Sequence, residues 1–292
     1  MNNKKAIVAS KLVKIILVLV VGLILFAFIT NFVNLLQKQS PKELCRLSVL
    51  AAAKSKLIGK PLIDSINCKT RYVNIDHNSI DLNKKKVTSI NVNNQAATIE
   101  IVKRTVADEL VTAWYQFGEG KLNPYGDFES GNKCIISSVI RFDESFSSKI
   151  PRINSIGTYL EKTNIAGTNL TYLEYLVNGK IEKELNFVEK AFTAQNPENA
   201  DDIITSQPYY VLFVIGSWDG KLKALIDIGG LGFAGFKLGS IAGPYGMIAG
   251  TIGGMAAGVY MYSETKDDAA YLITVVLIPA DELPDTCDSL EA

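Results

Sequence analysis

The chain is poor in the residues from which most catalytic and metal sites are built. Its 292 residues include one histidine, His77, and four cysteines with no Cys-x-x-Cys pair. A zinc site of the usual Cys/His type therefore lacks ligands at suitable spacings. Walker loops, HExxH helices and GxSxG elbows are also missing from the sequence. These absences disfavour the motif-defined hydrolases and nucleotide-binding enzymes, and we expect no cofactor.

The chain also lacks an excess of charge of either sign, because its 30 basic and 30 acidic residues balance to zero. Nucleic-acid-binding domains usually carry a basic excess, so we do not expect nucleic acid as a partner. Hydrophobic residues make up 48% of the chain. They concentrate in an early apolar run and in a glycine-rich stretch near the C-terminus, and the remainder is long enough to bury a core.

The early run covers 15–36 and contains no charged residue. At about 1.5 Å per residue a helix of this length reaches roughly 33 Å, enough for the hydrocarbon core of a bilayer. Lysines precede it at positions 4, 5, 11 and 14, and the first acidic residue is Glu43. The positive-inside rule then places 1–14 in the cytoplasm and the chain after residue 36 outside. The sequence thus predicts a single-pass, signal-anchored membrane protein.

Two cleaved leaders are the alternatives to this anchor. A secretory signal is disfavoured because the run is long and ends in the bulky residues Phe32 and Val33. A pilin-type signal at Lys5-Ala6 would need an uninterrupted apolar run, and Lys11 and Lys14 interrupt it.

The four cysteines, Cys45, Cys68, Cys134 and Cys287, all follow the apolar run. An even number in an oxidising compartment predicts two disulfides, for which three pairings exist. We favour Cys45–Cys68, tying the first helix to the first strand, with Cys134–Cys287, tying the C-terminal tail to a central strand. Free, buried cysteines are the alternative.

Hydrophobic periodicity predicts an α+β domain after the anchor. The clearest helix spans 99–117 and ends at Gly118. Its Trp114, Tyr115 and Phe117 are expected in the core. Further helices are predicted near 41–56, 153–162 and 170–177, and strands at 69–75, 87–92, 133–142, 209–217 and 270–279. We expect the last two strands to be neighbours in the sheet. On the strand at 133–142, alternation would put five residues on one side: Cys134, Ile136, Ser138, Ile140 and Phe142.

A glycine-rich insertion separates the last two strands, with 11 glycines between positions 229 and 258. Spacing by four predicts a helical hairpin with packed glycine faces that turns near Pro244. The predicted packing residues are Gly235, Gly239, Gly243, Gly246, Gly250, Gly254 and Gly258. The hairpin could lie in a membrane or be buried in the protein or an oligomer interface, and both readings stay open. Gly230-x-Gly232-x-x-Gly235 matches a dinucleotide pattern, but no strand–helix repeat surrounds it.

Three acidic residues of the long helix and its end, Asp108, Glu109 and Glu119, are the candidate acid–base groups. Adjacent residues on a helix point in different directions, so a solvated or capping role is the stronger interpretation. His77 lies beside Asp76 and near Asp81 in a segment typical of a surface turn. The acidic tail at 281–288 lacks the ligand spacing of an EF-hand loop.

Several segments in order resemble one protein family. They are Leu44-Cys45-Arg46, then Cys68-Lys69-Thr70-Arg71-Tyr72, then Ala107-Asp108-Glu109, then the run Trp114-Tyr115-Gln116-Phe117-Gly118-Glu119-Gly120-Lys121. This order is similar to uncharacterised membrane-anchored proteins encoded in archaeal genomes. The resemblance implies an anchor, an exterior domain and a cysteine framework, and it implies no activity. It also implies further cysteines where this chain has Ala113 and Ser137, so the disulfide pattern is free to differ.

These observations predict four segments: a cytoplasmic tail at 1–14, a transmembrane anchor at 15–36, an extracytoplasmic α+β domain at 37–223 plus 264–292, and the hairpin insertion at 224–263. The expected function is that of a non-enzymatic envelope or cell-surface protein. It would act through contacts with a lipid membrane, with itself as a homo-oligomer, or with another envelope protein. The alternatives are a membrane-tethered hydrolase using Asp108, Glu109 and Glu119, and a hairpin that inserts into membranes and forms pores.

Overall fold

The computed structural model describes residues 17, 19–26, 40–55, 66–122, 132–176, 202–217, 250–251, 255–263 and 270–291. The chain divides into two compact units, Met1–Leu44 and Cys45–Ala292. In the first unit, residues 19–26 are helical. The helix α2 (Pro41–Ser55) begins in the last four residues of this unit and continues into the second.

The predicted transmembrane anchor at 15–36 is contradicted. None of the helices in the described part of the chain combines the length and the apolar character needed to cross a membrane. The single-pass and signal-anchor assignments, with a cytoplasmic N-terminus and an external domain, are withdrawn with it.

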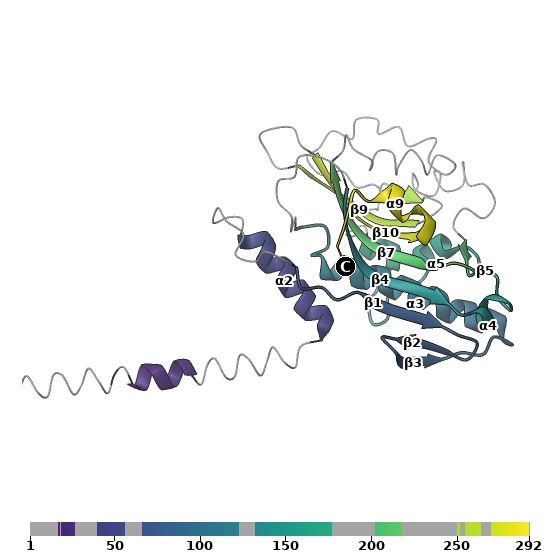
Figure 1. Ribbon diagram of the computed structural model, residues 1–292, viewed down its shortest axis with the longest axis horizontal. Helices are drawn as coiled ribbons and strands as arrows, with labels where there is room; N and C mark the ends of the chain where they lie inside the picture. The colour runs from purple at the N-terminus through teal and green to yellow at the C-terminus, as the bar shows by residue number, and fades with distance from the viewer. Residues whose placement is uncertain are drawn as a thin grey trace, which may run out of the picture. The chain divides into compact units, whose positions relative to one another are not determined.

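The second unit is a mixed α/β domain built on one large sheet (Figure 1). Among the described residues, nine strands join this sheet in the order β3-β2-β1-β4-β7-β10-β9-β8, with β11 paired to β4. The strands are β1 (Arg71–Ile75), β2 (Ser79–Leu82), β3 (Lys85–Ser89), β4 (Asn132–Phe142), β7 (Tyr209–Ser217), β8 (Gly250–Thr251), β9 (Met255–Ser263), β10 (Ala270–Pro279) and β11 (Ser289–Glu291). β1 and β11 run parallel to β4, and the other pairs are antiparallel.

Smaller elements complete the domain. They are the helices α4 (Glu144–Ser147), α5 (Ile156–Lys162), α6 (Tyr172–Leu176) and α9 (Leu283–Thr286), the 3-10 turn η3 (Ala280–Glu282), and the two-stranded pair β5 (Arg152–Ile153) and β6 (Ile203–Ile204). The predicted helices near 41–56, 153–162 and 170–177 and the predicted strands at 69–75, 133–142, 209–217 and 270–279 are confirmed within a few residues. β7 and β10 are neighbours, as expected.

The long helix α3 (Gln95–Gln116) packs on one face of the sheet and organises the core. Asn94 caps its N-terminus by accepting a hydrogen bond from the Ala97 amide, which satisfies one of the free N–H groups of the first turn. At the other end Gly118 has φ of +81°, a conformation that favours glycine and ends the helix. Val102, Val106, Leu110 and Ala113 of α3 are fully buried, and so are Trp114 and Phe117, as expected. Tyr115, which was also expected in the core, is only half-buried, as is Ile99 at the start of the apolar face.

A β-bulge in β4 changes which of its side chains face α3. Pairing with β7 shifts register between Ile136 and Ser138, so β4 has one extra residue at Ser137. Ile135 before the bulge and Ile140 after it both belong to the core cluster. Simple alternation cannot place an odd and an even residue on one face. The prediction that every second residue from Cys134 to Phe142 lies on one side of the strand is therefore wrong.

The helical hairpin predicted for the glycine-rich insertion is also wrong where the structure describes it. Residues 250–251 and 255–263 are the strands β8 and β9, and β9 pairs with β10 along its length. Gly250 and Gly258 thus lie in strands. Glycine lowers helix stability by about 1 kcal/mol, while valine and tyrosine, as at Val259 and Tyr260, favour strands. The other predicted packing glycines, Gly235, Gly239, Gly243, Gly246 and Gly254, lie outside the described residues.

Both predicted disulfides are confirmed. Cys45–Cys68 joins α2 to the segment that leads into β1, and Cys134–Cys287 joins β4 to the chain just before β11. Asp288 reinforces the second link, since its backbone N–H donates to the Asn132 carbonyl oxygen at 2.9 Å and its carboxylate accepts from the Asn132 amide at 2.8 Å. The C-terminal strand is therefore fixed covalently and by hydrogen bonds.

We predict that the two disulfides contribute unequally to stability. Cys134–Cys287 closes a loop of 153 residues and Cys45–Cys68 one of 23. Loop-closure entropy gives losses of about 5 and about 3 kcal/mol when each pair is replaced by alanine. Urea unfolding of the two paired variants of the full chain measures this difference. A larger loss for the Cys45/Cys68 variant would contradict the prediction.

Candidate functional site

The three acidic residues proposed as acid–base groups each contact a different part of the domain. The Tyr172 hydroxyl of α6 donates to Asp108 at 2.6 Å. An Arg71 guanidinium nitrogen lies 2.7 Å from a Glu109 carboxylate oxygen. Glu119 accepts from the Lys121 ammonium at 2.8 Å and from the Tyr175 hydroxyl at 3.1 Å. The carboxylates therefore fasten α3 and its end to surrounding segments and do not share partners.

Glu109 is the most buried of the three, with 5% of its side chain exposed. Burial raises the pKa of Glu109, and the charge and hydrogen bond of Arg71, together with the Ser138 hydroxyl, oppose that rise. Arg71 and Ser138 are directly paired residues of the parallel strands β1 and β4. Their side chains meet Glu109 of α3 between the sheet and the helix. We call Arg71, Glu109 and Ser138 the buried polar cluster.

A signal for this cluster was present in the sequence but was not used. Arg71, Val73 and Ile75 alternate along β1, so the three side chains share one face. Val73 and Ile75 are core residues. A charged residue in phase with core residues must find an opposite charge or remain unpaired in the interior. Alternation therefore pointed to an internal acid, although it could not say which one.

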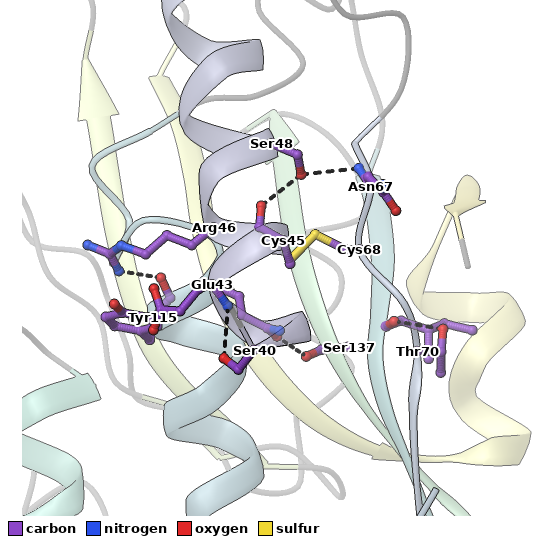
Figure 2. The surroundings of a disulfide bond; sticks show 12 residues. Ser40, Glu43, Cys45, Arg46, Ser48, Asn67, Cys68, Thr70, Tyr115 and Ser137 are labelled. Atoms are coloured by element: carbon purple, nitrogen blue, oxygen red, sulfur yellow. Dashed lines mark hydrogen bonds between the residues drawn. A yellow bond between two sulfur atoms is a disulfide. The ribbon is translucent and has the colours of Figure 1, made fainter. Parts of the chain in front are cut away.

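The second arginine contact lies at the Cys45–Cys68 disulfide (Figure 2). Arg46 follows Cys45 in α2, and its guanidinium stacks over the Tyr115 ring at 3.9 Å from the ring centre. It also donates to the Tyr115 carbonyl oxygen and lies 3.6 Å from Glu119. Burial acts to raise the pKa of Glu119, but Lys121, Tyr175 and Arg46 outweigh it and lower that pKa. The disulfide thus holds this part of α2 beside the end of α3.

Backbone and hydroxyl contacts fix the strand side of the same disulfide. The Asn67 amide donates to the Ser48 hydroxyl oxygen at 3.1 Å, and that hydroxyl donates to the Cys45 carbonyl oxygen (Figure 2). Two residues after Cys68, the Thr70 hydroxyl donates to the Ile136 carbonyl oxygen of β4 at 3.2 Å. These contacts position the start of β1, and with it Arg71.

Tyr172 joins a second polar contact of α3. It is buried, and its ring centre lies 6.0 Å from that of Tyr159 in α5. Burial and the hydrogen bond to Asp108 both raise the pKa of Tyr172. A hydrogen bond with Tyr159 raises the pKa of Arg104, which precedes Asp108 by one helical turn. Both tyrosines therefore serve to attach α5 and α6 to α3.

His77 lies in an exposed turn after β1, as predicted. Its Nδ1 is 3.2 Å from the Ser145 hydroxyl oxygen, and its Nε2 is 3.2 Å from the Asn78 side-chain nitrogen. The nearby Asp76 and Asp81 accept hydrogen bonds from the Ser79 hydroxyl. A Ser–His–Asp triad needs a carboxylate on the second ring nitrogen, and an amide occupies that place here. The contacts are those of a turn.

The described side chains of the acidic tail do not form a cation site. Asp281 is exposed, and Asp288 belongs to the β4 contact described above. Among the residues described, no group of three histidine, cysteine, aspartate or glutamate side chains is arranged to hold a metal ion.

Sequence analysis also missed a polar face of the sheet on the side away from α3. Tyr72 and Asn74 alternate with the core residues of β1, and Asn74 is paired with Asp81 of β2 and with Arg141 of β4. Lys86 of β3 is paired with Asp81. We call these five residues the outer face. Four of them are exposed, Asp81 is half-buried, and the Arg141 guanidinium lies 5.7 Å from the Tyr72 ring centre.

Glu109 gives a testable pH dependence. The pKa of Glu109 is raised from the ordinary 4.5. At a pH between 4.5 and the raised value, the folded chain therefore keeps a proton that the unfolded chain releases. Stability from this group is therefore greatest at acidic pH and is lost as pH rises through the raised value. We expect Glu109→Gln to flatten this decline in urea unfolding from about pH 4 to about pH 8.

The control for this experiment is Glu100→Gln, on the same helix. Glu100 is 62% exposed and lies 3.7 Å from Lys103. This variant should keep the pH profile of the unchanged chain. Parallel profiles for the unchanged chain and Glu109→Gln would contradict the assignment.

Comparison with known proteins adds no relative from which function could be transferred. No family model matches the chain, no curated protein matches it, and no solved structure matches it. Functional inference therefore rests on the contacts described above.

Proposed function

We propose that the chain is a non-enzymatic domain that acts through protein–protein contact, with a second copy of itself as the partner. The outer face is the surface that makes this contact. The observation that carries the proposal is the exposed pair of Tyr72 and Arg141. Tyrosine and arginine are enriched at the energetic centres of protein interfaces, because each buries a large area and keeps a polar group for the partner.

The charges of the outer face favour a second copy as the partner. Arg141 and Lys86 are basic, and Asp81 lies between their strands with an acidic group. A twofold contact brings the same surface from two molecules together, so that surface must complement itself. A face with both charge signs side by side meets this requirement, whereas a face of one sign would repel its copy.

The contacts of the acidic residues support a non-enzymatic role. A hydrolase site would need at least two of Asp108, Glu109 and Glu119 directed at one substrate position. Each of these carboxylates instead has its own internal partners. Asp108 contacts Tyr172, and Glu109 contacts Arg71. Glu119 contacts Arg46, Lys121 and Tyr175. Each carboxylate thereby helps to hold α3 in place.

Sedimentation velocity of the full chain over a concentration series tests the proposal. We expect a dimer whose dissociation constant rises about tenfold or more in Tyr72→Ala, as for a central interface residue. Arg141→Glu should weaken the dimer similarly. Combining Arg141→Glu with Asp81→Arg exchanges the charges of the face and should recover part of the lost affinity.

Glu161→Lys is the control, because Glu161 is an exposed residue of α5 outside the outer face. It should leave the dimer unchanged. A chain that stays monomeric throughout the series contradicts the proposal. A dimer that the Tyr72 and Arg141 variants leave intact contradicts the assignment of the surface.

A further inference from the structure

The buried polar cluster has hydrogen-bonding groups that its own contacts do not use. Its one close contact joins Arg71 Nη2 to Glu109 Oε1 at 2.7 Å. Three other atoms in the cluster are buried and have no hydrogen-bond partner within the described part of the chain: Arg71 Nε, Glu109 Oε2 and Ser138 Oγ. A buried polar group without a partner destabilises the folded chain, because it has lost its hydrogen bonds to water. Three such atoms in three converging side chains require a common explanation.

The geometry of the arginine pair shows which contact is missing. Nη2 lies on the same side of the guanidinium as the Nε–H, and these two donors usually bind the two oxygens of one carboxylate. Here only the Nη2–Oε1 half of that arrangement is formed. The other half, between Nε and Oε2, is not made. Arg71 Nε and Glu109 Oε2 are therefore both buried, and neither bonds to the other.

Ser138 is the third member of the cluster. It is the paired residue of Arg71 across the parallel strands, and its hydroxyl is one of the groups that act on the Glu109 carboxylate. Ser138 itself has no exposed surface. The bulge at Ser137 occurs next to it, and the Ser137 hydroxyl is already bonded to Gln116 of α3 at 3.3 Å. The Ser138 hydroxyl, by contrast, makes no hydrogen bond of its own within the described part of the chain.

We propose that the buried polar cluster is a binding site for one water molecule. The water accepts the Arg71 Nε–H, donates to Glu109 Oε2, and makes its third hydrogen bond with Ser138 Oγ. Buried waters typically make about three hydrogen bonds to groups that would otherwise be unsatisfied. The site is electrically balanced, since Arg71 and Glu109 carry opposite charges, and it therefore suits a small neutral molecule that both donates and accepts. The water joins β1, α3 and β4.

A crystal structure of the full chain, at a resolution that shows ordered waters, tests the proposal directly. The expected result is one water within hydrogen-bond distance of all three atoms. A direct bond between Arg71 Nε and Glu109 Oε2 with no water between them would overturn it. A protonated Glu109 bonded directly to the Ser138 hydroxyl would overturn it as well.

Nuclear magnetic resonance tests the same site in solution. The Arg71 Nε–H should show a cross-relaxation signal to a long-lived water, and the exposed Arg141 Nε–H should show none. Ser138→Val removes the third hydrogen bond and should abolish the Arg71 signal. Ser137→Ala, which alters the adjacent hydroxyl, should retain it. No signal at Arg71 in the unchanged chain, or a signal that survives in Ser138→Val, counts against the site.

Discussion

The packing of α3 against the sheet is the interaction on which the rest of this structure depends. Trp114 and Phe117 are fully buried, and the Phe117 ring stacks on Phe213 of β7 with ring centres 4.2 Å apart. Burying a large apolar side chain contributes about 1.5–3 kcal/mol, and α3 buries several. This gain allows the same helix to carry the buried carboxylate of Glu109. It also fixes the helix face from which Asp108 reaches α6.

The polar residues of α3 and of its C-terminal cap extend that packing to segments far apart in the sequence. Glu109 reaches β1 through Arg71, Asp108 reaches α6 through Tyr172, and Glu119 reaches α2 through Arg46. Cys45–Cys68 holds α2 and the start of β1 together, so it fixes the origins of both arginines. Residues that resemble an acid–base set in the sequence thus serve as attachments. The outer face, centred on Tyr72 and Arg141, is the surface that we propose for contact with a second copy.

Local patterns were sufficient for several elements and for both disulfides. The apolar spacing of α3, the continuous runs of β7 and β10, and both cysteine pairs were predicted correctly. The parallel register of β1 and β4 and the bulge at Ser137 were not predicted, because nothing local encodes them. β2 was missed for its mixed composition, and β9 because periodic glycine suggested a helix. The anchor predicted at 15–36 is contradicted, since no helix in the described part of the chain is long and apolar enough to cross a membrane.

The central claim is that the acidic residues of α3 and its cap are structural attachments. A double-mutant cycle on the full chain tests it most directly, using Tyr172→Phe, Asp108→Ala and the combined variant. Urea unfolding would give the coupling free energy between the two side chains. The account predicts a favourable coupling of about 1–3 kcal/mol, as for a hydrogen bond to a charged group. A coupling near zero would contradict it.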